Sequence, residues 1–493
     1  MTIPPAKQTI ADRRPPQTLT EAWIALAGLS AVFLFEMLDN SILNVALPTI
    51  GSELGASTVS LQWVTGVYAV VFGGLMLAFG AVADRFGRRR VMLIGLALLA
   101  LASLATAFVS TAGELIAVRA LMGIAAAMTT PGSIALAFRL FESDRLRVRA
   151  MTLISTVGLV GLAVGPTVGG FVVAVAPWQV LLLVNVPVAI LAFLGIRFGI
   201  ARDERSELHR DPIDVAGAVL GTVAIVFALL SPTLLVSEGA GSWHAWSVVA
   251  VALLASILFV ARQRSARYPL LDLSLLARPL VSSGLAYKAA TGLAVAGMGY
   301  LVTLQLQLDW NWPPYLASLG MLPQVVVLVL GGPLSNRFIE RVGLDRAAWL
   351  SSICVVVGLG IFGLLSSRGY VWIAMALTLV AAGIRVNGVV AGTNVLRGLP
   401  KSRTSIGAAL VDTASEVATA VGIATAGTVL AAVFTGSIAQ SNWSTVQTGQ
   451  FESGVLIAGI ALTAVSAALV GFGIMRGRSA IELVHRWRFL STP

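Results

Sequence analysis

Four acidic residues lie inside stretches of sequence that are otherwise apolar. In one such stretch, Glu36 and Asp39 stand three residues apart. In another, Asp412 and Glu416 stand four residues apart. Both spacings place the two members of a pair on one face of a helix. An ionisable group at membrane depth is costly unless it faces a partner or a cavity, so each acid is a candidate functional residue.

These acids could exchange protons for cations. A carboxyl group in a low-dielectric cavity has a raised pKa, so it holds a proton near neutral pH and releases it when a cation arrives. The opposing hypothesis is structural, because Arg119, Lys288 and Arg385 also lie in apolar stretches. The acids could simply pair with Arg119 or Arg385. Lys288 lies about two turns from the start of its stretch, so its ammonium group could extend to the membrane surface.

The apolar stretches that contain these residues are long enough to span a membrane as helices. The chain has 493 residues, of which 57% are hydrophobic and 11% charged, whereas about a quarter of a soluble domain is charged. A run of about 20 apolar residues crosses a bilayer as a helix. We therefore predict an all-α integral membrane protein with fourteen transmembrane helices. The fourteen runs lie near residues 22–47, 60–82, 91–110, 113–138, 150–176, 179–197, 213–232, 245–261, 281–306, 315–336, 347–366, 370–396, 404–433 and 454–475.

The positive charges are distributed unevenly between the loops. Most of the 33 Lys and Arg residues fall in the two tails and in one set of alternate loops, and the other set holds only Arg368. Under the positive-inside rule both termini are cytoplasmic, which requires an even number of spans. We predict a multi-pass protein of the cell (inner or cytoplasmic) membrane, in contact with the lipid bilayer.

Several function classes have no support in the sequence. The net charge of +10 could suggest a nucleic-acid partner, but the basic residues are scattered among loops, so no nucleic acid is predicted. The chain has no Gly-Lys pair, and therefore no phosphate-binding G-x-x-x-x-G-K-[ST] loop. It also lacks the H-E-x-x-H and G-x-S-x-G motifs of metalloproteases and hydrolases. We predict that the protein is not an enzyme, holds no metal or cofactor, and is driven by a proton gradient.

An internal repeat organises the runs. The loops GAVADRFGRRR (80–90) and GGPLSNRFIERVG (331–343) share an order of Gly, Asp or Asn, Arg-Phe and Arg. Parallel six-helix repeats around a midplane site are a transporter architecture. The predicted segments are a cytoplasmic N-terminal tail (1–21), a six-helix bundle (22–198), linkers with two inserted helices, the seventh and eighth (199–280), a second six-helix bundle (281–476) and a basic cytoplasmic tail (477–493).

Glycines recur along the fifth run, in GLVGLAVGPTVGG (158–170). Gly158, Gly161, Gly165 and Gly169 are spaced three, four and four residues apart. They therefore share one helix face, which a neighbouring helix can approach closely. Pro166 lacks a backbone donor and favours a bend. A generic packing face would explain the glycine stripe alone.

Several motifs together resemble those of the major facilitator superfamily, and within it the fourteen-span drug/proton antiporters. The loop 80–90 resembles the loop signature of the superfamily, and RALMG (119–123) resembles its Arg-containing second signature. The Gly-Pro pair and the Gly169-Gly170 pair make the glycine-rich run similar to the antiporter signature. MLDNSILNVALPTI (37–50) and WQVLLLVNVPVAI (178–190) resemble the span-one and span-six signatures.

The resemblance implies a major-facilitator-type fold and roles for single residues. Asp39 lies in the span-one signature, and Asp412 and Glu416 match acidic positions of relatives that export quaternary ammonium compounds. Asp39 and Asp412 would be the principal exchanging groups. Glu36 and Glu416 would widen the negative surface for larger or doubly charged cargo. Arg119, near the outer side, would help the proton to leave.

Two further features carry expectations from the same resemblance. Arg385 departs from the family pattern and would pair with a carboxylate or bind an anionic group of the substrate. The loop after the second run resembles a charge latch between the two halves. Its residues are Gly80, Asp84, Arg85, Gly87 and Arg88. Asn336 in the second copy cannot carry the charge of Asp84, so the latch would be one-sided.

Three function classes differ in how many of these features they explain. Proton-coupled export of amphipathic cations, such as drugs or quaternary ammonium compounds, explains both the antiporter signature and the four buried acids. Proton-coupled transport of an endogenous metabolite or lipid, by symport or export, is the alternative; uptake by symport explains the acids but not the signature. A non-transporting sensor or channel explains neither. We therefore predict a proton antiporter that works by alternating access, with small cations and protons as its partners.

Overall fold

Long apolar helices make up most of the described chain. The computed structural model describes residues 16–203, 214–239, 241–399, 404–438 and 443–490. Within them, thirteen helices are long and apolar enough to cross a membrane, and a bent pair brings the count to fourteen. This confirms the predicted all-α membrane fold. Most of the predicted N-terminal tail lies outside the described residues.

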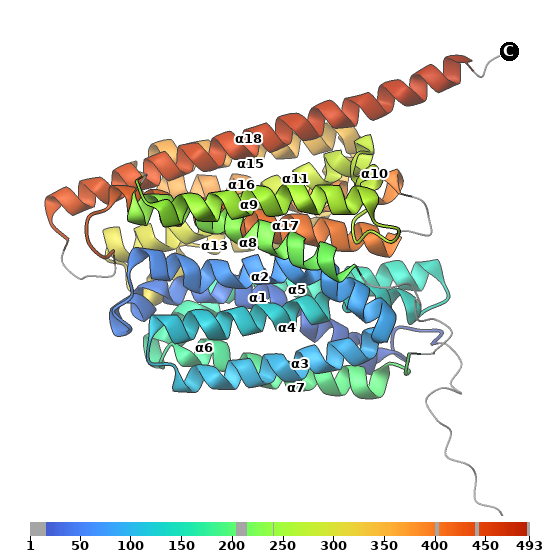
Figure 1. Cartoon of the computed structure of the whole chain (residues 1–493), viewed down its shortest axis with the longest axis horizontal. Helices are drawn as coiled ribbons and strands as arrows, with labels where there is room; N and C mark the ends of the chain where they lie inside the picture. Colours follow the sequence, from blue (N-terminus) through green and yellow to red (C-terminus); the bar gives the residue numbers. More distant parts are fainter. Residues whose placement is uncertain (1–15, 204–213, 240, 400–403, 439–442, 491–493) are drawn as a thin grey trace, which may run out of the picture.

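The first six spans form one side of the bundle. Figure 1 shows α3 and α7 at one edge of the molecule and α15 and α18 at the opposite edge. The helices of the first half are α1 (Trp23–Glu53), α2 (Thr58–Phe86), α3 (Arg88–Ala105), α4 (Ala112–Arg139), α5 (Asp144–Val175), α6 (Gln179–Leu183) and α7 (Asn185–Gly199). Span six comprises both α6 and α7.

The last six spans form the second half. They comprise α11 (Pro279–Leu304), α12 (Pro314–Leu319), α13 (Leu322–Leu330), α14 (Gly332–Val342), α15 (Leu344–Leu365), α16 (Tyr370–Gly398), α17 (Thr404–Val433) and α18 (Thr445–Leu490). Helix α11 is extended by a π-helical turn over Gln305–Asp309. The two halves pack together through α2 with α17 and through α5 with α12 and α13.

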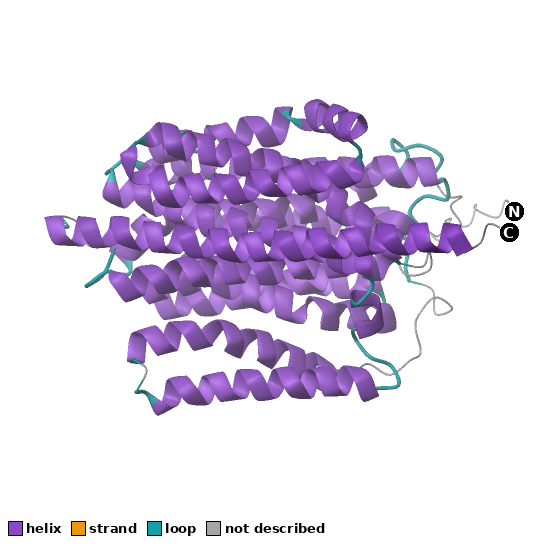
Figure 2. Ribbon diagram, turned by 90° about the horizontal axis from the view of Figure 1, so that it is seen from above, coloured by secondary structure: helices purple, strands orange, loops and turns teal. Residues whose placement is uncertain are grey.

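The two inserted helices lie beside this bundle. Helix α8 (Val215–Glu238) packs on α2 and α17, and α9 (Trp243–Ser265) packs on α8. Figure 2 shows this hairpin set apart from the other helices. A buried polar cluster joins it to both halves, because Gln62 Nε2 donates to Thr233 Oγ1 at 3.1 Å and to Thr428 Oγ1 at 3.4 Å.

Two segments differ from the straight spans that hydropathy suggests. The run 315–336 is broken, and its two parts meet at 59°. Gly331 and Gly332 have a low helix propensity. Pro333 has no backbone N–H to donate to the hydrogen bonds of a continuous helix. At the C-terminus, α18 continues through most of the predicted tail to Leu490 and projects beyond the bundle (Figure 1).

The two ends of the bundle are distinct. Helix α1 begins and α18 ends at the same end (Figures 1 and 2), which we call the terminal end. The opposite end is called the far end. Several hydrogen bonds join the two halves near the far end: Gln307 Nε2 donates to the Val45 carbonyl at 2.8 Å, and Ser437 Oγ donates to the Ala56 carbonyl at 3.0 Å. The described halves are therefore held together at the far end.

Candidate functional site

Asp39 of α1 and Arg119 of α4 form a buried ion pair. Arg119 Nη1 donates to Asp39 Oδ2 at 2.5 Å, and Asn185 Nδ2 donates to Asp39 Oδ1 at 3.0 Å. Arg119 Nε donates to the Val64 carbonyl at 3.3 Å, and the guanidinium lies 4.5 Å from the Tyr68 ring centroid. Both charged side chains are almost fully buried. Each oxygen of the Asp39 carboxylate therefore has a donor.

Glu36, Asp412 and Glu416 form a second group, which we call the acidic cluster. Glu36, from α1, accepts a hydrogen bond from Thr130 Oγ1 at 2.8 Å. Asp412 and Glu416 come from α17, and their charges act on the Glu36 carboxyl group. Asp412 Oδ2 and Glu416 Oε2 are buried and have no hydrogen-bond partner among the described residues. Because a buried polar atom without a partner is costly, these two oxygens are suited to a proton or a cationic ligand.

The packing of α2 explains where the acidic cluster lies. A Cβ atom placed on Gly73 of α2 would lie 3.2 Å from Glu416 Cβ. Glycine at this position lets α17 approach α2 closely enough to bury the glutamate stem. Glu416 is only 4% exposed as a result. The structure thus brings three of the four predicted acids together, and it places Asp39 with Arg119 instead.

Lys288 of α11 belongs to this region, and the expectation that its ammonium group extends to the membrane surface stays a prediction. Its charge acts on the carboxyl groups of Glu36, Asp412 and Glu416. The rotation of α11 explains why Lys288 lies near the acids. Tyr287 packs in an apolar cluster with residues of α15 and α16, and the next residue along the helix points about 100° away from it.

Arg385 of α16 lies apart from the four acids. Its guanidinium lies directly against Gly332, at the break between α13 and α14. Among the described residues, it forms no ion pair with a carboxylate. The expectation that Arg385 pairs with one of the acids is therefore wrong for this structure. Its alternative role, binding an anionic group, stays a prediction.

The glycine face of α5 packs as predicted. Gly158, Gly161, Gly165 and Gly169 all face residues 33–42 of α1. A Cβ on Gly169 would lie 2.9 Å from Ile42 Cγ1, so the close approach requires glycine there. Gly170 faces the other half, against Pro314 and Ser318. Pro166 lies inside α5, which remains continuous from Asp144 to Val175.

The loop between α2 and α3 has contacts within itself and with the start of the linker that follows α7. Arg88 Nε donates to Asp84 Oδ1 at 2.7 Å. Gly87 has φ = 104°, a conformation that favours glycine, and it lies against Asp203. Asp203 Oδ2 also accepts from the Arg89 backbone N–H at 3.1 Å.

These contacts bear on the predicted latch. Gly80 packs on Pro131 of α4, and Arg85 is exposed. Among the described residues, no hydrogen bond or ion pair joins Asp84 to the second half. Asp203 was not predicted from the sequence, although it stands as an acid in a basic loop.

Three uncharged residues of the site were also missed. Thr130, Asn185 and Tyr68 are polar side chains within apolar runs, and that property is the signal that could have found them. Asn185 even lies within the quoted span-six motif. The Tyr68 hydroxyl is buried without a partner among the described residues, and the charges of Asp39, Glu36 and Glu416 all act on it.

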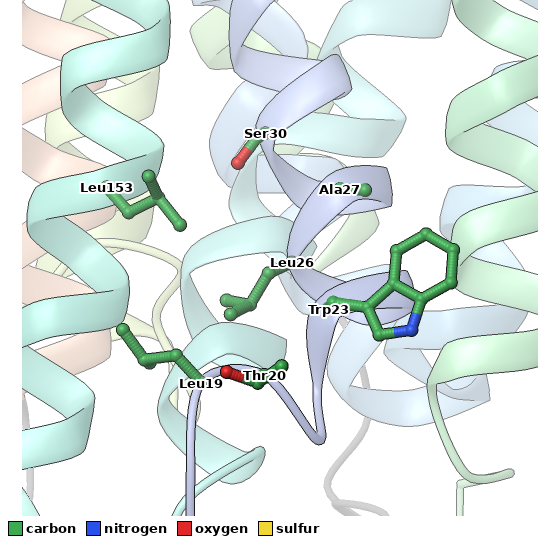
Figure 3. A pocket seen from close by; sticks show the side chains of 7 residues that line it. All are labelled: Leu19, Thr20, Trp23, Leu26, Ala27, Ser30 and Leu153. Atoms are coloured by element: carbon green, nitrogen blue, oxygen red, sulfur yellow. The ribbon is translucent and has the colours of Figure 1, made fainter.

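A separate pocket of about 390 Å³ lies at the terminal end. Figure 3 shows it beside the start of α1, with Leu153 of α5 across from it. Its lining is apolar except for two hydroxyl groups and the Trp23 indole, and it contains none of the predicted acids. It is therefore distinct from the acidic cluster.

Comparison with known proteins finds one family model and several relatives named for efflux or resistance. The family model described as Major Facilitator Superfamily matches residues 29–423. The methyl viologen resistance protein SmvA of Salmonella typhimurium is 29% identical over 421 residues, 84% of each chain. The multidrug efflux pump LfrA of Mycolicibacterium smegmatis is 30% identical over 426 residues, 86% of this chain and 83% of its own. The multidrug resistance protein Stp of Mycobacterium tuberculosis is 27% identical over 82% of this chain and 75% of its own.

Proposed function

This chain belongs to the Major Facilitator Superfamily, and we propose that it exports amphipathic cationic drugs in exchange for protons. The family and the relatives make it a multi-pass membrane transporter and not an enzyme. The relatives named for efflux and drug resistance support drug export. Proton coupling and a cationic substrate are the finer parts of the proposal.

The observation that carries the proposal is the pair of unpartnered oxygens in the acidic cluster. Asp412 Oδ2 and Glu416 Oε2 are buried without a donor from the described residues. A proton satisfies such an oxygen, and so does a cation, but the two compete for the same place. Binding of a cationic substrate would therefore release protons, which is the exchange that an antiporter requires.

The Asp39–Arg119 pair supports a second proton site nearer the far end. A proton on Asp39 would remove the negative charge that Arg119 contacts at 2.5 Å. The strength of the contact between α1 and α4 would then depend on the protonation of Asp39. An inward membrane potential contributes about 2.3 kcal/mol per charge per 100 mV, so proton entry could drive export without ATP.

The proposed direction of transport depends on how the protein is oriented in the cell membrane. Under the positive-inside rule the terminal end faces the cytoplasm. Contacts between described residues hold the halves together near the far end. A cytoplasmic approach to the acidic cluster is consistent with these contacts, and rocking of the halves would then move the opening to the outside.

Everted membrane vesicles with a preset acidic interior test this proposal. Adding ethidium should collapse part of the proton gradient in vesicles with the native protein. The double variant Asp412→Asn, Glu416→Gln should bind and exchange ethidium at least about tenfold more weakly, because each lost charge-assisted contact is worth about 1.5–3 kcal/mol. Glu340→Gln, which removes an exposed acid of α14, is the matched control.

The same assay separates the alternatives. Proton symport predicts the opposite coupling direction, and a sensor predicts no flux. Native exchange by the double variant at normal protein levels would reject the acidic cluster as the exchange site.

A further inference from the structure

Lys288 is a cation inside the membrane-spanning region without a counter-ion in contact. It is half-buried, and no carboxylate oxygen of the described residues lies within 4.0 Å of its ammonium group. Nevertheless its charge acts on all three carboxyl groups of the acidic cluster. A cation and three acids thus share one region without closing into ion pairs.

The register of α11 and α17 shows why Lys288 and Asp412 lie at the same level. A Cβ on Gly292 of α11 would lie 2.5 Å from the Ser415 carbonyl of α17, and Gly297 faces Gly422. Residue numbers rise together along both helices, so the helices run parallel. Lys288 precedes Gly292 by four residues and Asp412 precedes Ser415 by three. At about 1.5 Å of rise per residue, the two charged residues differ in height by only about 1.5 Å.

The polar groups of this region have opposite chemistry. Lys288 offers three N–H donors, whereas Asp412 Oδ2 and Glu416 Oε2 are acceptors without donors among the described residues. Glu416 is only 4% exposed, so bulk water does not solvate it freely. A ligand that satisfies both requirements carries a cationic group for the acids and an anionic group for the lysine.

We propose that the acidic cluster and Lys288 together bind zwitterionic amphipathic substrates, with Lys288 contacting the carboxylate of the substrate. This inference rests on the proposed function and refines its substrate class. The positive group of the substrate would lie between Asp412 and Glu416. For a purely cationic substrate, Lys288 is instead a nearby like charge, and it weakens binding.

The proposal predicts effects of opposite sign on two matched dyes. Rhodamine 110 carries a free carboxylate and a delocalised positive charge, and rhodamine 123 is its methyl ester, which retains only the positive charge. In the variant Lys288→Met, the dissociation constant for rhodamine 110 should rise by about tenfold or more. The dissociation constant for rhodamine 123 should stay the same or fall. Lys288→Arg should restore binding of rhodamine 110.

Fluorescence polarisation with the purified full-length protein in lipid nanodiscs measures these constants. Retained binding of rhodamine 123 by Lys288→Met shows that the variant is folded. Equal losses for both dyes would overturn the inference and make Lys288 an internal counter-ion. No change for either dye would overturn it too, because Lys288 would then contribute to the binding of neither. Native protein that binds rhodamine 123 but not rhodamine 110, or neither dye, would overturn it as well.

The outcomes for the two proposals remain distinguishable. Binding of both dyes with the predicted Lys288 dependence, but without proton exchange in vesicles, would reject the proposed antiport and leave the zwitterion site standing. Proton exchange with rhodamine 123 but no binding of rhodamine 110 would reject the zwitterion site and leave the proposed antiport standing.

Discussion

The Asp39–Arg119 pair and the acidic cluster are both buried charged groups of the same bundle, but they differ in how their atoms are satisfied. Both oxygens of Asp39 accept hydrogen bonds from charged or amide donors. In the acidic cluster, by contrast, Asp412 and Glu416 each keep an oxygen without a partner among the described residues. The depth of an acid in the membrane therefore does not by itself mark a ligand site; the unpartnered atoms do.

The two groups also differ in where they lie relative to the halves. The ion pair and its neighbours come from α1, α2, α4 and α7, all within the first half. The acidic cluster joins Glu36 of the first half to Asp412 and Glu416 of the second. If the halves rock, the ion pair can move as one body, whereas the geometry of the acidic cluster must change. The acidic cluster can therefore bind a substrate with different affinity in different conformations.

The largest effect on stability is expected from Arg119→Leu. It leaves the Asp39 carboxylate buried without its cation, and breaking a buried pair in this way costs about 3–5 kcal/mol. The melting temperature in detergent and the yield of monodisperse protein should both fall sharply. The double variant Asp39→Asn, Arg119→Leu should recover much of the loss, because it leaves no unpaired charge. Equal losses in the single and double variants would show that packing of Arg119, and not its charge, supports the fold.

A smaller effect is expected from Gly169→Val, which tests the helix that carries both groups. The added Cβ would lie 2.9 Å from Ile42 Cγ1 and 3.0 Å from the Ile42 carbonyl oxygen. Overpacking of this kind costs about 1–3 kcal/mol, and it would push α1 with Glu36 and Asp39 away from α5. Gly471→Val is the control, because a Cβ there has no described atom within 4 Å. Equal melting temperatures for the two variants would mean that α1 is free to shift.

Much of the fold could be predicted from the sequence because it depends on local properties. Hydropathy located the fourteen spans, and the glycine spacing in the fifth run located the face that packs on α1. The break in the tenth span has a local cause too, in the adjacent Gly331, Gly332 and Pro333. Local sequence patterns therefore account for the helices and for the break in the tenth span.

The arrangement of the site depended on contacts that no local pattern contains. Arg119 and Asp39 are 80 residues apart, and nothing in either run shows which of several acids the arginine meets. The direction of Lys288 depends on the rotation of α11 against α17, which is determined by glycine contacts on both helices. Arg385 was expected near the acids, but the broken tenth span places Gly332 beside it instead.

A still smaller effect on stability is expected from Asp84→Asn, which removes an exposed pair. Asp84 and Arg88 are 36% and 24% exposed, and such pairs contribute about 0–1 kcal/mol. If the loop acts as a latch in another conformation, the exchange rate should fall while substrate affinity stays unchanged. Arg90→Gln removes an exposed charge of the same loop and serves as the control. A native exchange rate in Asp84→Asn would limit Asp84 to orienting the protein in the membrane.

The smallest effect on stability, and the sharpest contrast with Arg119→Leu, is expected from Glu416→Gln. The glutamate has a buried oxygen without a described donor. Replacing it with a neutral amide of the same shape therefore breaks no ion pair between described residues, and the site no longer has to bury a charge or take up a proton. The melting temperature should therefore stay the same or rise, even though ethidium exchange falls. The matched comparison is Asp39→Asn, which strips Arg119 of its partner and should lower the melting temperature. Thermal unfolding of both variants in the same detergent measures the difference. If Glu416→Gln lowers the melting temperature as much as Asp39→Asn does, Glu416 has a structural partner in the membrane. The distinction between a paired and an unpaired buried acid would then no longer hold for this protein.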